Sequence, residues 1–198
     1  MATLQSTTVN GSVSLTAGSV GAPSIIASGD TNTGVFFPAD NSISFVTGGQ
    51  VAMNINSSGY VTKPRHPVLN ASDDRAIALS TSEINSTNFY NILSTDLGGR
   101  FSAATGRFTA SVQGFYQATF WVAQATQGAS TNVRIQLNGA QNTGPLAEAW
   151  NQSGVGCINT WVTCVLYLNV NDYISLQAAA FNSNSGRQHK RFHIRFLG

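Results

Sequence analysis

The residue types that most often carry catalysis are few and scattered in this chain of 198 residues. Charged residues make up only 9% of it, far below the usual quarter. The eight carboxylates are Asp30, Asp40, Asp73, Asp74, Glu83, Asp96, Glu148 and Asp172. They form no acid–base or metal motif, and the chain has neither a Gly-x-Ser-x-Gly turn nor a phosphate loop. We therefore predict no enzyme, no metal and no cofactor.

Basic residues near the C-terminus form the one unusual concentration of charge. They are Arg187, His189, Lys190, Arg191, His193 and Arg195, with no acid among them. If residues 189–197 form a strand, His189, Arg191, His193 and Arg195 share one face. One hypothesis is a site for phosphate or an acidic sugar of a bacterial surface, since guanidinium binds two oxygens at once. The alternative is a row that is solvated or paired within an interface.

Two further features bear on binding and on redox chemistry. The long segment Gly139–Gly156 is polar and is predicted to be a loop. It contains Trp150, a candidate aromatic platform for a glycan, although an ordinary polar loop is the alternative. Cys157 and Cys164 are too few for a disulfide framework and are predicted to be free thiols.

The stretch Gly99–Gln124 indicates two or three strands joined by tight turns. Its last part, Phe115–Gln124, is the most strand-like run of the chain. Strand alternation places Phe115 and Trp121 on one face, and Tyr116, Ala118, Phe120 and Val122 on the other. A strand that is apolar on both faces needs cover on both. We predict that a second sheet covers one face and that another copy of the chain covers the other.

A similar argument applies to the long apolar run Ile158–Val170, which contains Trp161. In a monomer, such two-faced strands expose apolar patches that favour aggregation. Phe115, Trp121 and Trp161 are therefore the candidate residues of a trimer interface.

The prolines of Lys63–Pro67 favour a stiff extended connector, which divides the chain. We predict a β-rich stem at 1–62, a linker at 63–67 and a head at 68–198. The stem consists of short apolar alternations separated by Gly, Pro, Asn and Ser, with a turn predicted at Gly48-Gly49. It is either a floppy linker or a fibrous β-region stabilised when chains wrap together. We favour the fibrous region because the alternation is regular.

The head shows strand patterns with turn signals at even spacing. The predicted strands, beyond the stretch above, are Ala76–Leu79, Phe89–Leu93, Asn132–Leu137, Ile158–Val170, Tyr173–Phe181 and His189–Leu197. Asn138-Gly139 and Asn171-Asp172 are predicted turns. About eight strands in this arrangement favour a sandwich or jelly roll.

Six segments of the head follow one another in a recognisable order and spacing: Phe89–Leu93, Thr105–Ala110, Gly114–Phe120, Val133–Gly139, Val165–Leu168 with Asn171–Leu176, and Phe192–Leu197. In these residues the head resembles the jelly-roll globular heads of complement and tumour-necrosis-factor type. The chain departs from it at Val170-Asn171-Asp172, where the family often has Lys-Gly-Asp. The resemblance implies a homotrimer in which one sheet of each subunit faces the threefold axis.

Between Gly18 and Val61 the stem carries the motifs GSVGAPSI, GDTNTGVFFPADNSISFVTGG and MNINSSGYV. In these motifs it resembles segments of tail-fibre and other virion appendage proteins of tailed bacteriophages. It implies a structural protein of the virion that is synthesised in the host cytoplasm. Its stem would contact other virion proteins, and its head would bind the host surface, including a surface glycan.

The fold class we expect is all-β: a short β-rich fibrous stem followed by an antiparallel jelly-roll sandwich, homotrimeric. A capsid-decorating fibre or tail-needle knob with a mainly structural role is one alternative. A secreted lectin-like recognition protein is another, and a polysaccharide depolymerase lacks its carboxylate pair. The net charge of +2 does not favour nucleic acid. Met1–Gly11 lacks the pattern of a signal peptide, and no apolar run predicts membrane insertion.

Overall fold

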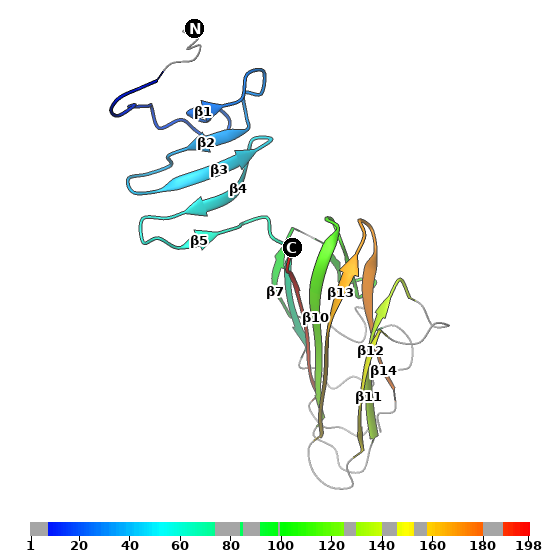
Figure 1. The fold of residues 1–198 in the computed structure, drawn as a ribbon. Coiled ribbons are helices and arrows are strands. Elements are labelled where there is room, and N and C mark those ends of the chain that lie inside the picture. The colour runs from blue at the N-terminus through cyan, green and yellow to red at the C-terminus, as the bar shows by residue number, and fades with distance from the viewer. Residues whose placement is uncertain are drawn as a thin grey trace. The chain divides into compact units, whose positions relative to one another are not determined.

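The computed structural model describes residues 8–73, 84, 92–98, 100–124, 130–139, 146–152, 158–179 and 188–198. Within these ranges every regular element is a β-strand, and the strands form three five-stranded sheets with antiparallel pairing (Figure 1). The chain divides into two compact units, Met1–Arg65 and His66–Gly198. The described part of the chain contains no helix long and apolar enough to span a membrane.

The first unit is a meander in which each strand pairs with the next. Its strands are β1 (Ile25–Ile26), β2 (Gly34–Phe36), β3 (Ile43–Thr47), β4 (Gln50–Ile55) and β5 (Val61–Thr62). Gly48 and Gly49 join β3 to β4 with φ of 55° and 70°. Two successive positive φ values suit the tight hairpin turns that match the twist of paired strands. The turn predicted at Gly48-Gly49 is therefore confirmed.

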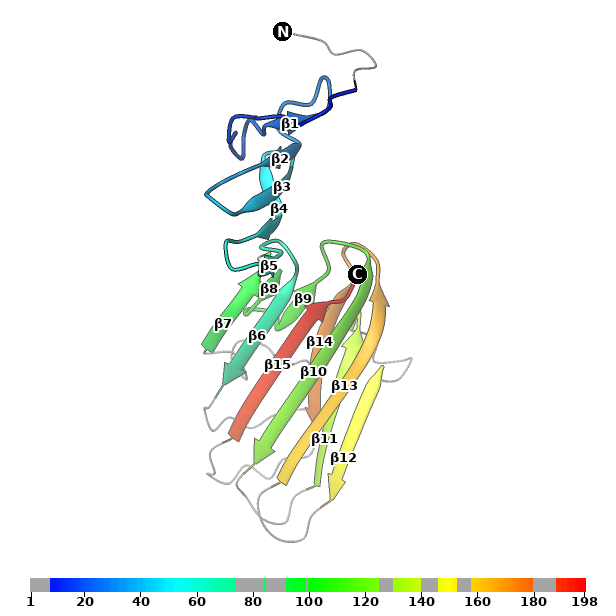
Figure 2. The same cartoon turned by 60° about the vertical axis from the view of Figure 1, so that its left-hand side comes forward.

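The second unit is a sandwich of two sheets (Figure 2). The sheet that we call the β10 sheet has the order β13-β10-β15-β6-β7, and the β11 sheet has the order β12-β11-β14-β9-β8. The strands are β6 (Val68–Asp73), β7 (Ile92–Leu97), β8 (Phe101–Ser102), β9 (Arg107–Thr109), β10 (Gly114–Gln124), β11 (Ser130–Leu137), β12 (Ala147–Gln152), β13 (Ile158–Leu168), β14 (Tyr173–Ala179) and β15 (Gln188–Phe196). Because the chain passes repeatedly from one sheet to the other, the order is that of a jelly roll.

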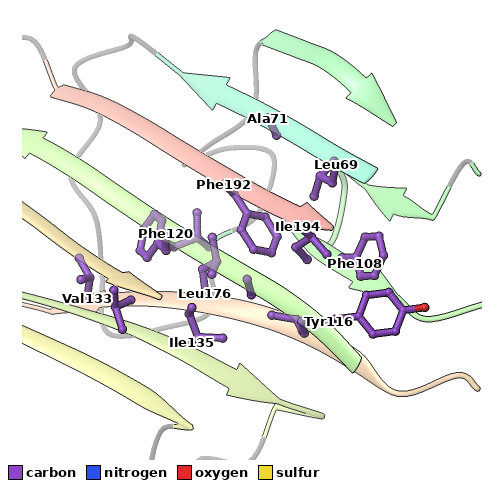
Figure 3. Close-up of a cluster of buried hydrophobic side chains, with 14 of the residues drawn as sticks. Leu69, Ala71, Phe108, Tyr116, Phe120, Val133, Ile135, Leu176, Phe192 and Ile194 are labelled. Atoms are coloured by element: carbon purple, nitrogen blue, oxygen red, sulfur yellow. The ribbon is translucent and has the colours of Figure 1, made fainter. Parts of the chain in front are cut away.

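The core of the second unit lies between these two sheets (Figure 3). From the β10 sheet it receives Tyr116, Ala118, Phe120, Val122, Phe192 and Ile194, and from the β11 sheet it receives Val133, Ile135, Ile174, Leu176 and Ala178. The predicted partition of β10 into two faces is confirmed, since its even-numbered residues from Tyr116 to Val122 are buried. The Tyr116 hydroxyl donates to the carbonyl oxygen of Val112 at 2.8 Å, which satisfies the one polar group of a buried aromatic side chain.

Some predicted elements differ from the observed ones. Ala147–Gln152 forms β12, so the prediction of one long loop over Gly139–Gly156 is wrong there. β7 begins at Ile92 and continues to Leu97, beyond the end predicted for Phe89–Leu93. The predicted strand Ala76–Leu79 lies outside the described residues. Asn138 and Gly139 have φ of 53° and 66°, which confirms the predicted turn.

Gly114 begins β10 where the backbone leaves no room for a side chain. Its φ is +147°, and an added Cβ would lie 2.6 Å from Cε2 of Phe196 and 2.7 Å from the carbonyl oxygen of Gly198. We expect Gly114→Ala to lower the free energy of unfolding by about 2–4 kcal/mol, because overpacking adds to backbone strain. Gly98→Ala is the control. Gly98 also has positive φ, but its added Cβ meets only Cγ of Arg100 at 3.8 Å. Urea denaturation in which both variants lose equal stability would contradict this account.

Candidate functional site

The outer face of the β10 sheet is defined by the side chains that point away from the core. Antiparallel register places them in rows across β13, β10 and β15. Trp121 lies between Trp161 and Arg191, Thr119 between Thr163 and His193, and Gln117 between Val165 and Arg195. In the last row, Phe115 lies opposite Tyr167.

The part of this face on β10 and β13 exposes large apolar side chains towards both ends of the strands, with Thr119, Thr163 and Gln117 between them. Trp161 is 61% exposed, Phe115 is 52% exposed, and Val165 and Tyr167 are exposed to similar degrees. Phe115 and Tyr167 meet edge to face with ring centroids 5.3 Å apart. Two apolar clusters on one face, Trp161 with Trp121 and Phe115 with Tyr167 and Val165, favour a contact surface over an ordinary solvated face.

Arg191, His193 and Arg195 form a basic row along β15 on the same outer face. The Arg191 guanidinium carbon lies 5.6 Å from the ring centroid of Trp121, within cation–π range. Nε of Arg195 donates to Oε1 of Gln117 at 2.7 Å. Both guanidinium groups are therefore held against side chains of β10, and within the described part of the chain neither forms an ion pair.

The structure brings together most of the site residues predicted from the sequence. Phe115, Trp121 and Trp161, predicted as interface residues, lie on one face with Arg191, His193 and Arg195, predicted as an anion site. His189 pairs with Ala123 in the same register, and its side chain lies outside the described residues. The sequence leaves two roles open for the basic residues, a place in the trimer interface or an anion site. The structure bears on this choice because it puts them on the same face as the predicted interface residues.

Trp150 is separate from this face. It lies on β12, and its backbone pairs with Asn132 in the β11 sheet. Its side chain is not among those that the structure describes. The outer side of the β11 sheet is polar: Nε of Arg134 contacts Oε1 of Glu148 at 2.8 Å, and Asn132 also donates to Glu148. Among the described side chains, the outer face that exposes large aromatic residues is therefore that of the β10 sheet.

Sequence patterns alone did not single out Val165, Tyr167, or the hydroxyl pair of Thr119 and Thr163, which lie 2.9 Å apart. A strict two-residue alternation through β13 would have found those on β13, because it places residues 163, 165 and 167 on the same face as Trp161. Cys164, on the opposite face, is a free thiol, as predicted, while Cys157 lies outside the described residues. Among the residues that are described, no cluster of His, Cys, Asp and Glu is suited to hold a metal ion.

Burial, followed by the charge of nearby Arg195, lowers the pKa of His193 below its ordinary value. The unfolded chain therefore binds a proton at this residue more readily than the folded chain. The free energy of unfolding therefore decreases as the pH falls below about 6.5. The decrease stops once His193 is protonated in the folded chain as well. We expect His193→Gln to reduce the loss of thermal stability between pH 7.5 and pH 5. A wild-type protein and variant with equal losses in calorimetry would contradict this expectation.

Comparisons with known proteins agree with this architecture. A family model described as the C1q domain matches residues 72–198. Among solved structures, the globular domain of the zebrafish complement 1qA protein matches with a TM-score of 0.53 and 18% sequence identity, covering 67% of this chain and 98% of that one. At this identity the likeness shows the fold alone. A comparison with curated proteins found no match.

Proposed function

The chain belongs to the C1q domain family, and from this we propose that it is a non-catalytic, homotrimeric attachment protein. The family serves recognition and structural roles, and its domains typically form homotrimers. Membership confirms the predicted likeness of the head to complement-type jelly rolls. For this chain itself we propose that it forms a trimer, that it is attached to a larger particle, and that its head binds a target.

The observation that carries the proposal is the apolar outer face of the β10 sheet. Burying a large apolar side chain contributes about 1.5–3 kcal/mol, and each chain offers Phe115, Trp161, Val165 and Tyr167 on one surface. Three copies that turn this face toward a common axis would remove these side chains from water. A monomer would leave the whole surface exposed.

We place the basic row at the border of this interface rather than in a separate ligand site. The support is that Arg191 and Arg195 contact Trp121 and Gln117, which lie on the interface face itself. The double variant Arg191→Gln, Arg195→Gln should then remain able to bind cells but show a changed salt dependence of trimer stability. The anion-site alternative requires the opposite: an unchanged trimer that no longer binds cells.

The first unit supplies the attachment to a larger particle. Its support is the resemblance of Gly18–Val61 to tail-fibre segments, which concerns residues outside the matched C1q region. We accordingly place the protein in the virion of a tailed bacteriophage, assembled after synthesis in the host cytoplasm, with the head directed at the host surface. Several trimers on one particle would combine weak contacts into useful avidity.

Electron microscopy of purified particles labelled with antibody to residues 130–139 or to another head segment tests this placement. Label at the tail supports host recognition, and label on the capsid supports the decorating alternative. Particles without label, together with free protein in the culture medium, would overturn the virion assignment. That result would favour the secreted lectin-like alternative, which the C1q family membership supports equally well.

A further inference from the structure

The Met1–Arg65 unit has an apolar face that crosses all five of its strands. Antiparallel partners lie on the same side of a sheet. In one row Ile25, Val35, Phe45 and Met53 are successive partners from β1 to β4. In the next row Ile43, Ile55 and Val61 are partners across β3, β4 and β5. We call these seven residues the stem face.

Every member of the stem face is apolar, and every member is accessible to solvent. Ile25 is 50% exposed, Ile43, Phe45 and Val61 are also exposed, and Val35, Met53 and Ile55 are half-buried. The opposite side of the sheet differs, since Phe36, Ser44 and Val46 are buried there. The large apolar side chains that the sheet buries therefore lie on that side, and none of the stem face is buried.

The described part of this unit has a small buried core. Phe36 and Val46 are its large apolar buried side chains. Burial of so few side chains does little to offset the entropy lost when the chain becomes ordered. A second layer against the stem face would supply the missing burial.

The stem face continues into an open hollow of about 740 Å³. Ile43 and Ile55 belong to both, and Leu15, Phe37 and Pro38 add further apolar lining. Asp40, Asn41 and Ser42 line the hollow as well, so it adjoins the apolar stem face but is itself mixed in polarity.

We propose that the stem faces of three copies of this chain pack against one another. This inference rests on the proposed trimer of the heads. The first unit ends at Arg65 and the second begins at His66, so a head trimer tethers three stem faces to one another. Tethering of this kind produces millimolar effective concentrations. The stem face carries no charge, so it offers nothing to a charged partner, whereas three identical apolar faces suit one another.

Adjacent isoleucines in β1 provide a matched test. Ile25 lies on the stem face and Ile26 on the opposite side, and they are 50% and 41% exposed in the single chain. Ile25→Cys and Ile26→Cys are made separately in the full chain carrying Cys157→Ser and Cys164→Ser. Each is treated with a charged aromatic disulfide reagent, and the released thiolate is followed by absorbance. The same samples are examined by sedimentation.

We expect the thiol at position 25 to react at least tenfold more slowly than the thiol at position 26 in the folded trimer. The two rates should become equal in guanidinium. They should also become equal when Trp161→Lys separates the trimer into single chains. This last result identifies other copies, rather than the head of the same chain, as the cover.

Failure of the stem-face inference and failure of the proposed trimer give different results. Equal rates in a sample that sediments as a trimer would overturn the stem-face inference while the proposed trimeric head stands. Slow reaction at position 25 in a single-chain variant would also overturn it, because the cover would then come from the same chain. A wild-type protein that sediments as a single chain would instead overturn the proposed function, and this inference with it.

Discussion

Replacement of Trp161 by lysine is expected to convert the trimer into single chains at micromolar concentration. Trp161 lies opposite Trp121, which in turn pairs with Arg191, and it is 61% exposed in the single chain. Loss of a buried interfacial tryptophan costs about 2–4 kcal/mol. The new ammonium group adds a further cost, because it must lose water on a face that already carries two arginines. Since three copies make the same loss, we expect trimer dissociation at concentrations at least about a hundredfold higher than for the wild-type protein.

Val170→Lys is the matched control for this variant. Val170 is also an exposed apolar residue, but it follows β13 and lies outside the rows of the outer face. We expect it to sediment as the wild-type trimer. If Trp161→Lys also remained a trimer under the same conditions, the outer face of the β10 sheet would not be the interface.

Phe120→Ala is expected to cause the largest loss of folding stability. Phe120 is completely buried, and its neighbours across β13 and β15 are Val162 and Phe192. Truncation of a buried phenylalanine costs about 3–5 kcal/mol because it leaves a cavity. A domain has about 5–15 kcal/mol of net stability. We therefore expect the midpoint of thermal unfolding to fall by roughly 10–20 °C, as followed by circular dichroism.

Phe115→Ala on the same strand provides the comparison, since Phe115 points away from the core. Both variants are made in the Trp161→Lys background, because trimer formation itself contributes to apparent stability. In single chains we expect Phe115→Ala to change the midpoint by only a few degrees. Equal losses for the two variants would show that the two faces of β10 are not divided between core and interface as described.

Strand alternation was sufficient to predict the two faces of β10 and β15. In β10 the even-numbered residues from Tyr116 to Val122 are buried, and in β15 Phe192 and Ile194 are buried while Arg191 and Arg195 are exposed. Both strands pair on two sides, so their two-residue period is uninterrupted. The same period predicts that Phe115 and Trp121 share a face of β10, and their register with β13 and β15 confirms it.

β12 was not predictable in the same way. Its sequence from Ala147 to Gln152 contains Ala and Glu, which have low intrinsic preference for strands. It adopts a strand because it pairs with β11, for example Glu148 with Arg134. Such pairing is set by tertiary context and not by local periodicity. The local pattern therefore predicts a loop at Trp150, although its backbone lies in a sheet.

The stem face also depends on information that the sequence patterns do not contain. Alternation along the sequence predicts that β3 and β4 each have an apolar face. Whether the two faces form one surface depends on the register between the strands. A register shift between Phe45 and Val46 keeps Ile43 opposite Ile55 and Phe45 opposite Met53. A slip of one residue would have sent one strand's apolar side chains to the other side.

The oligomeric state of the full chain decides whether the outer face of the β10 sheet lies between copies, and sedimentation velocity over a dilution series measures it. We expect one species with three times the chain mass of 20.9 kDa, persisting to concentrations well below a micromolar. A folded, soluble species of 20.9 kDa that remains stable throughout the series would rule out the trimer.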